Sequence, residues 1–203
     1  MMYWVWRFRF SLAVQIVIVT IGWLTLGHTP EQHAHLMNHV GLSWQLLTEG
    51  RIWHIFTGTW VQSKPGLGWN MISMCMMVAL GTFPLEYRVG SRLTAITLII
   101  ADWFASTMAA VTLWMLAEFG RLSDPGVLHK PDAGTSALAW AGMAAGAVVF
   151  IPRLRWVLVP VVVGFVGWQF TIEPPAAAIA HAFAVGYGLT AGWLFLRTRS
   201  VQP

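Results

Sequence analysis

Six apolar segments restrict this chain more than any other feature of its sequence. A helix that crosses a membrane needs about 20 mostly apolar residues, and the candidate segments are 8–27, 67–85, 93–117, 134–151, 156–171 and 177–196. Only 10% of the 203 residues are charged, whereas about 25% is usual in a soluble protein. The sequence therefore predicts an all-α, polytopic membrane protein: one domain, residues 1–203, with six transmembrane helices. A signal peptide is the alternative interpretation of the first segment.

The positive charges alternate in step with these segments. In a six-span arrangement one side carries Arg7, Arg9, Arg88, Arg92, Arg153, Arg155, Arg197 and Arg199. On the other side, four cations are diluted by six carboxylates. Because cytoplasmic loops are enriched in Lys and Arg, both termini are predicted in the cytoplasm, and a bacterial inner membrane is the favoured location. The membrane topology accounts for the net charge of +4. No further cluster of basic residues remains that could form a groove for nucleic acid.

The long segment 28–66 is predicted to be an external loop with short helices that lie in the lipid headgroup region. It contains a histidine cluster, namely His28, His33, His35 and His39. His35 and His39 are four residues apart and share a helix face, so Zn²⁺ or Cu²⁺ binding is one hypothesis. No cysteine or clear acidic ligand completes such a site, and a wet interfacial helix is the favoured interpretation.

Four of the polar side chains within the spans are informative. Asn70, Ser136 and His181 each lie just inside the external end of a span, so they share one shallow depth. A hydroxyl beside an imidazole can act as nucleophile and general base, although a serine bonded to its own helix and an interfacial histidine are the structural alternatives. Asp102 lies deeper, near mid-bilayer. We expect it to be protonated, or paired with a polar group such as Thr107 or Ser73, and to be too deep to orient His181.

Small residues accompany Ser136 and His181. Gly134 leaves an open approach for a substrate backbone, span four contains Gly142-x-x-x-Gly146, and span six places Ala184 and Gly188 on the histidine's face. Small residues let membrane helices approach closely. Spans four and six are therefore expected to pack tightly enough for a Ser–His hydrogen bond, although tight packing alone also explains these glycines.

Several short motifs follow one another between Glu49 and Leu196. In order they are Trp53-His54, Gly66-Leu67-Gly68-Trp69-Asn70, the stretch from Gly81 through Glu86 to Gly90-Ser91, Gly134-Thr135-Ser136-Ala137, and Ala180-His181 through Ala184 to Gly188. In this order and on these spans, the stretch 49–196 resembles the rhomboid intramembrane serine proteases.

The resemblance implies a six-helix bundle with a water-filled cavity that is open to the outside. It implies a Ser136–His181 dyad without a third acidic member, an oxyanion site made by Asn70 and the Ser136 backbone N–H, and Trp140 stacked on His181. The substrate would be the transmembrane helix of another protein, which enters from the lipid bilayer and is cleaved near its external end. No metal or organic cofactor is expected.

Three departures from the family motifs define the alternative. Gly66 replaces a histidine that donates to the oxyanion, and loss of one such donor costs about 2.7–4 kcal/mol in the transition state. Ala137 replaces the glycine after the nucleophile, and His54 replaces the arginine of a Trp-Arg motif. They motivate a second hypothesis: a catalytically inactive rhomboid-like scaffold that binds transmembrane helices as a subunit of a larger membrane complex.

Overall fold

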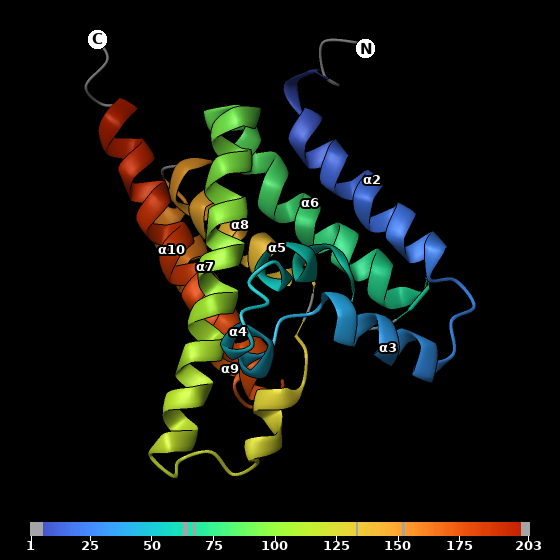
Figure 1. Ribbon diagram of the computed structural model, residues 1–203. Helices are drawn as coiled ribbons and strands as arrows, with labels where there is room; N and C mark the ends of the chain where they lie inside the picture. Colours follow the sequence, from blue (N-terminus) through green and yellow to red (C-terminus); the bar gives the residue numbers. More distant parts are fainter. Residues whose placement is uncertain (1–5, 63–64, 67, 133, 152, 200–203) are drawn as a thin grey trace.

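The computed structural model describes residues 6–62, 65–66, 68–132, 134–151 and 153–199 of the chain (Figure 1). Within these ranges the fold is all-α, as the sequence predicts, and the only β pairing is an isolated bridge between Leu42 and Asp132. Its six longest helices are α2 (Arg9–Leu24), α6 (Trp69–Val89), α7 (Ser91–Glu118), α8 (Ser136–Val149), α9 (Arg155–Gln169) and α10 (Pro175–Arg199).

Each of these helices occupies one of the six apolar segments, with ends that differ by only a few residues. In the part of the chain that the structure describes, two helical stretches, Ser91–Glu118 and Pro175–Thr198, are long and apolar enough to cross a membrane, whereas α2, α8 and α9 are apolar but shorter. The helical prediction is therefore confirmed, while the six membrane crossings stay a prediction.

The segment between α2 and α6 forms the short helices that its pattern predicts. They are α3 (Pro30–Val40), α4 (Trp44–Thr48), α5 (His54–Thr57) and the 3₁₀ turn η1 (Gly58–Trp60). The side chain of Thr29 caps α3 in a reciprocal capping box with Gln32. A second 3₁₀ turn, η2 (Pro125–His129), lies in the loop between α7 and α8.

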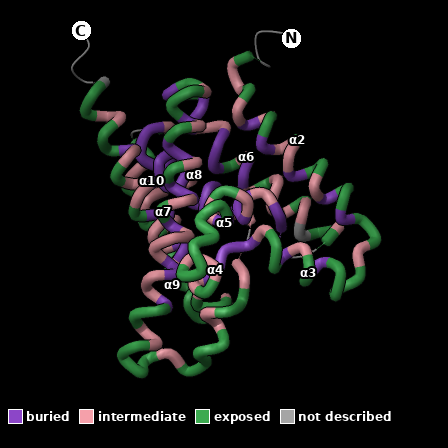
Figure 2. The backbone as a smooth tube through the Cα atoms, in the orientation of Figure 1, coloured by how far each residue is buried: buried purple, intermediate pink, exposed green. Residues whose placement is uncertain are grey.

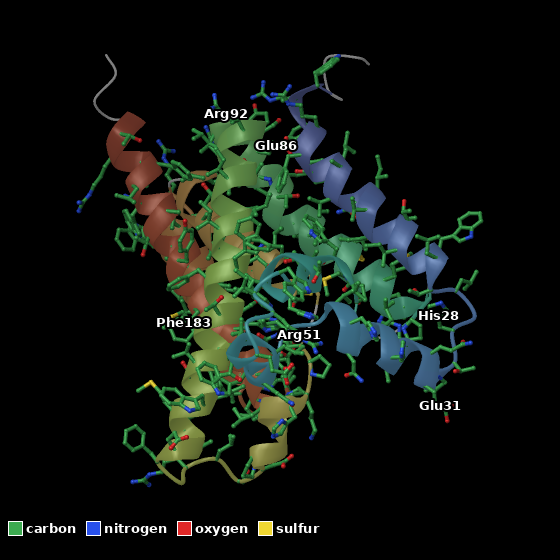
Figure 3. The ribbon with its side chains drawn as sticks, in the orientation of Figure 1. His28, Glu31, Arg51, Glu86, Arg92 and Phe183 are labelled. Carbon is green, nitrogen blue, oxygen red and sulfur yellow. The ribbon has the colours of Figure 1, made fainter. Side chains whose placement is uncertain are left out.

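The two ends of the bundle differ in charge and in loop structure. The start of α2 and the end of α10 lie at the same end (Figure 1). Arg92 lies at that end, whereas His28, Glu31 and Arg51 lie toward the other (Figure 3). The elements α3, α4 and η2 also lie toward the other end. This arrangement agrees with the alternation of charge along the chain.

Helix α8 is the centre of the bundle, and all its residues except Ser136 and Met143 are buried (Figure 2). It is packed between α10 and α6. A Cβ atom added to Gly192 of α10 would lie only 3.0 Å from the carbonyl oxygen of Ala145. The close approach expected between the fourth and sixth spans is thus present. It is made by Gly188 and Gly192, whereas Gly142 faces α6.

A buried carboxylate joins α2 to α6. Glu86 accepts hydrogen bonds from the backbone N–H groups of Phe10 (2.9 Å) and Ser11 (2.8 Å), and also from the Ser11 hydroxyl. The first N–H groups of a helix have no partner within it, and a negative charge there is favourable. Glu86 therefore holds the start of α2 against the end of α6, near Arg92 (Figure 3).

Candidate active site

Ser136 and His181 meet where the first turn of α8 faces α10. The Ser136 Oγ lies 2.9 Å from the Nε2 of His181, within hydrogen-bond distance. His181 is only 4% exposed, while Ser136 is half-buried. The close contact that the small residues predicted is therefore present. The catalytic role of the pair stays a prediction.

The first turn of α8 is held by a carboxylate from α7. Asp102, which is 1% exposed, accepts the backbone N–H of Leu138 at 3.1 Å and the hydroxyl of Thr59. Leu138 is the third residue of α8, so its amide lacks a partner within the helix. Asp102 is thus paired with a polar group, as expected, but that group is Thr59 of η1. The reason is tertiary, because Asp102 faces η1 and the start of α8.

The turn before Ser136 is held by the loop that precedes α6. The Gly134 N–H donates to the carbonyl oxygen of Gly58 at 2.9 Å, and Gly134 has a φ of +131°, a region that side chains disfavour. The buried Gln62 side chain donates through Nε2 to the Thr135 hydroxyl at 3.2 Å. The sequence pattern did not mark Gln62 as a site residue, because nothing in its local spacing connects it with Ser136.

His181 also has two polar partners at its other nitrogen. Its Nδ1 lies 2.9 Å from the Oε1 of Gln169 and 3.2 Å from the Oε2 of Glu173, and the Nε2 of Gln169 donates to the Oε1 of Glu173 at 2.8 Å. If Nδ1 carries the proton, it donates to Gln169, and Nε2 is free to accept from Ser136.

An acidic side chain, Glu173, therefore lies beside His181, although the resemblance implies a dyad without a third acidic member. Helix α9 ends at Gln169, and the chain turns back into α10 at Pro175. This turn brings residues 169 and 173 around to the ring of His181. Their one signal in the sequence is the pair Pro174-Pro175, because proline favours the first turn of a helix and so marks a short return before His181.

Trp140 lies beside His181, but the two rings are tilted rather than stacked. Their centroids are 5.8 Å apart and the interplanar angle is 43°. Trp140 is one turn below Ser136 on α8 and is 4% exposed. Its indole therefore forms an apolar wall next to the imidazole.

A cavity of about 640 Å³ opens next to the pair. Its lining includes Ser136, Trp140 and His181, together with Met77 of α6 and Phe165 of α9. Pockets that hold organic ligands usually measure about 300–1,000 Å³. On another side of Ser136, a separate pocket of about 20 Å³ is lined by polar groups that include His54, which is 2% exposed.

The remaining residues of interest have other surroundings. Gly66 has a φ of +84° and donates its N–H to the Thr25 hydroxyl at the end of α2, so its role is to form a turn. The side chain of Asn70, which the resemblance assigns to the oxyanion site, lies outside the described part of the structure.

The histidine cluster is divided between different partners. His33 donates from Nε2 to the carbonyl oxygen of Gln62 at 2.9 Å, while His35 and His39 have ring centroids 4.3 Å apart. Within the described ranges, no group of three or more His, Cys, Asp or Glu side chains is arranged to hold a metal ion.

Comparisons of the chain with protein-family models, with curated proteins and with solved structures find no match.

Proposed function

We propose that this chain is an intramembrane serine endopeptidase with a rhomboid-like six-span bundle, located in a bacterial inner membrane with both termini in the cytoplasm. The observation that carries the proposal is the 2.9 Å contact between Ser136 Oγ and His181 Nε2 at the wall of a cavity of about 640 Å³. The motifs that resemble rhomboid proteases supply the family assignment.

The surface supports a membrane location. Large apolar side chains are exposed along the outward faces of four helices; examples are Ile16, Trp23, Met76, Leu80, Ile96, Ile100, Trp156 and Val161. Contiguous exposed apolar surface of this kind is rare on soluble proteins. At about 1.5 Å per residue, the 28 residues of α7 span roughly 42 Å, which exceeds a hydrocarbon core of about 30 Å.

The shortness of α8 also agrees with this location. Its 14 residues span only about 21 Å. A helix surrounded by other helices does not need to cross the bilayer alone, and its N-terminus can end below the membrane surface where water fills a cavity. Ser136, the first residue of α8, lines the large cavity. A hydrolytic site within the membrane requires such access to water.

In the proposed reaction, Ser136 Oγ forms a bond to the carbonyl carbon of the scissile peptide while its proton passes to His181 Nε2. The carbonyl π electrons move to the oxygen. The C–N bond then breaks, and His181 gives the proton to the leaving amine. A water molecule attacks the acyl-enzyme with the same proton transfers and releases Ser136. The Nδ1 proton stays on the ring throughout.

The backbone N–H of Ser136 is the proposed oxyanion donor on α8, because it lies in the first turn at the positive end of the helix dipole. Ala137 fits this geometry, since it is a helical residue and the described residues include no side-chain-bearing residue with positive φ. Gly66 supplies no side-chain donor to the oxyanion. We therefore expect a rate about 10²–10³ below that of an enzyme with one more donor.

We propose that the substrate is a transmembrane segment that enters between α6 and α9. Both helices line the large cavity, and a second pocket of about 220 Å³ lies among α6, α8 and α9, with an apolar lining that includes Leu80, Met143 and Val162. An apolar segment could pass this gap from the lipid and present its external end to Ser136.

The test is labelling by a fluorophosphonate probe in native membranes. We expect the wild type to be labelled and Ser136→Ala not to be labelled. In His181→Ala the labelling rate should be about 10²–10⁴-fold lower than in the wild type. Ser123→Ala and His35→Ala are matched controls, because both residues are exposed and outside the cavity. Thermal unfolding would verify that each variant folds.

A folded wild-type protein without labelling, or labelling that persists in Ser136→Ala, would contradict the protease proposal. The first of these results would favour the inactive scaffold that binds transmembrane helices of a partner protein. Analysis of the proteins that copurify with the chain would then be the next step.

A further inference from the structure

The Oε2 atom of Glu173 is a buried carboxylate oxygen that accepts no hydrogen bond, although it lies 3.2 Å from His181 Nδ1. The other oxygen, Oε1, accepts from Gln169. In the resting site the Nδ1–H of His181 can donate to the Oε1 of Gln169, which at 2.9 Å is closer than the Oε2 of Glu173. A buried polar atom without a partner costs free energy. The cost is recovered when a positive charge forms beside it.

We propose that Glu173 is a positioning residue for the proposed serine protease reaction, and that its carboxylate stabilises the imidazolium form of His181 during attack by Ser136. The inference rests on the proposed function. It makes the site a Ser–His–Glu arrangement in which Gln169 connects the acid to the histidine.

The proton transfers explain why this contact acts mainly in the transition state. Before attack, His181 is neutral and carries one proton on Nδ1. As the bond from Ser136 Oγ to the carbonyl carbon forms, Nε2 takes the hydroxyl proton, and the ring becomes a cation. Glu173 itself neither gains nor loses a proton. Its negative charge, 3.2 Å from Nδ1, therefore favours the charged ring over the neutral one, which is the condition for lowering the barrier.

The other groups that contact His181 directly are uncharged. Helix α8 contributes Ser136 and Trp140, and α9 contributes Gln169. Lys130 and Asp132 line the same large cavity from the loop that contains η2, and Asp132 also lines the small pocket, together with His54. Substitution of Glu173 leaves all of these groups in place, so its effect on His181 can be measured separately.

The kinetic experiment compares fluorophosphonate labelling rates of the wild type, Glu173→Gln and Glu173→Asp, with Glu118→Gln as the matched control. Glu118 is an exposed carboxylate at the end of α7. Loss of the acid from a Ser–His–Asp site costs about 10⁴. Because Gln169 still holds Nδ1–H and Glu173 is 28% exposed, we expect a smaller decrease in Glu173→Gln, about 10- to 100-fold. Glu173→Asp should recover part of it.

The pH profile separates this role from a structural one. Attack requires neutral His181, so labelling falls on the acidic side. Removal of the Glu173 carboxylate changes the electrostatic field at the ring, which lies 3.2 Å from it, so the acidic limb of Glu173→Gln should be displaced from that of the wild type. A residue that only supports the fold would lower the rate at every pH and leave the limb unchanged.

A second readout does not require activity. Nitrogen-15 NMR of histidine-labelled protein, with His181→Ala for assignment, measures the pH at which His181 takes up its second proton. We expect this pH to differ between Glu173→Gln and the wild type, and to stay unchanged in Glu118→Gln. Identical titration of His181 in the wild type and Glu173→Gln would overturn the inference about Glu173, whether or not the wild type is labelled. Absence of labelling with a shifted titration would instead refute the protease function alone.

Discussion

Asp102 allows a quantitative prediction because its two hydrogen bonds join the first turn of α8, which contains Ser136, to η1. It is 1% exposed, so water cannot replace it easily. In Asp102→Ala the N–H of Leu138 and the hydroxyl of Thr59 lose their acceptor. Each buried unsatisfied group costs about 1–3 kcal/mol, so the free energy of unfolding should fall by about 2–6 kcal/mol.

Asp102→Asn is the informative comparison. Its side-chain carbonyl can still accept from Leu138, and its amide can donate to Thr59 if the hydroxyl rotates to accept. The loss is then small, about 1 kcal/mol, because Leu138 and Thr59 both keep a hydrogen-bond partner. For a chain of about 200 residues 1 kcal/mol shifts Tm by roughly 2–4 °C. Asp102→Ala should therefore lower Tm on the order of 10 °C, and Asp102→Asn by only a few degrees.

The assay is thermal unfolding in detergent, together with the rate of fluorophosphonate labelling. A shift of about 1 Å in a reacting group can cost 10²-fold, so we expect slow labelling in Asp102→Ala and a rate within about tenfold of wild type in Asp102→Asn. Equal Tm values for the two variants would refute the reasoning, because they would show that the hydrogen bonds to Leu138 and Thr59 do not support the fold.

Three further predictions concern packing, topology and pH. Gly188→Val should destabilise the bundle by about 1–3 kcal/mol or more in thermal unfolding, because its Cβ would collide with the α8 backbone. In a Cys75→Ser background, cysteines placed at the exposed Ser123 and Thr198 should react with an impermeant maleimide from opposite sides of the membrane; reaction from the same side would contradict six spans. A hydrogen bond from Lys130 holds the pKa of Asp124 below its usual value. Carboxyl NMR should show the ion pair between these two residues, which flank η2, intact at neutral pH and lost as the pH falls through that lowered value.

The six long helices were predictable from the sequence, because each depends on a continuous apolar run that is visible locally. Their ends agree with those of the apolar segments to within a few residues. The short helices between α2 and α6 were also predictable, since the Thr29 capping box and the proline at the start of α3 are local signals. The proximity of Ser136 and His181 followed from depth and small residues.

The partners of these two residues were decided by tertiary structure. Asp102 lies 34 positions before Ser136 in the chain, and only the packing of α7 against η1 and α8 brings it to Leu138 and Thr59. Glu173 counted in the sequence merely as one of several external carboxylates. The turn between α9 and α10 carries it to His181.

The physical reason for this division is the range of the interactions involved. Apolar length, helix caps and charge alternation act over a few residues or along one segment, so the sequence by itself determined the helices and the positions of Ser136 and His181 near the starts of α8 and α10. A hydrogen bond between side chains depends on distances of about 3 Å between different helices. Those distances follow from how Gly188 and Gly192 let α10 approach α8, and only the tertiary structure decided which acid accompanies His181.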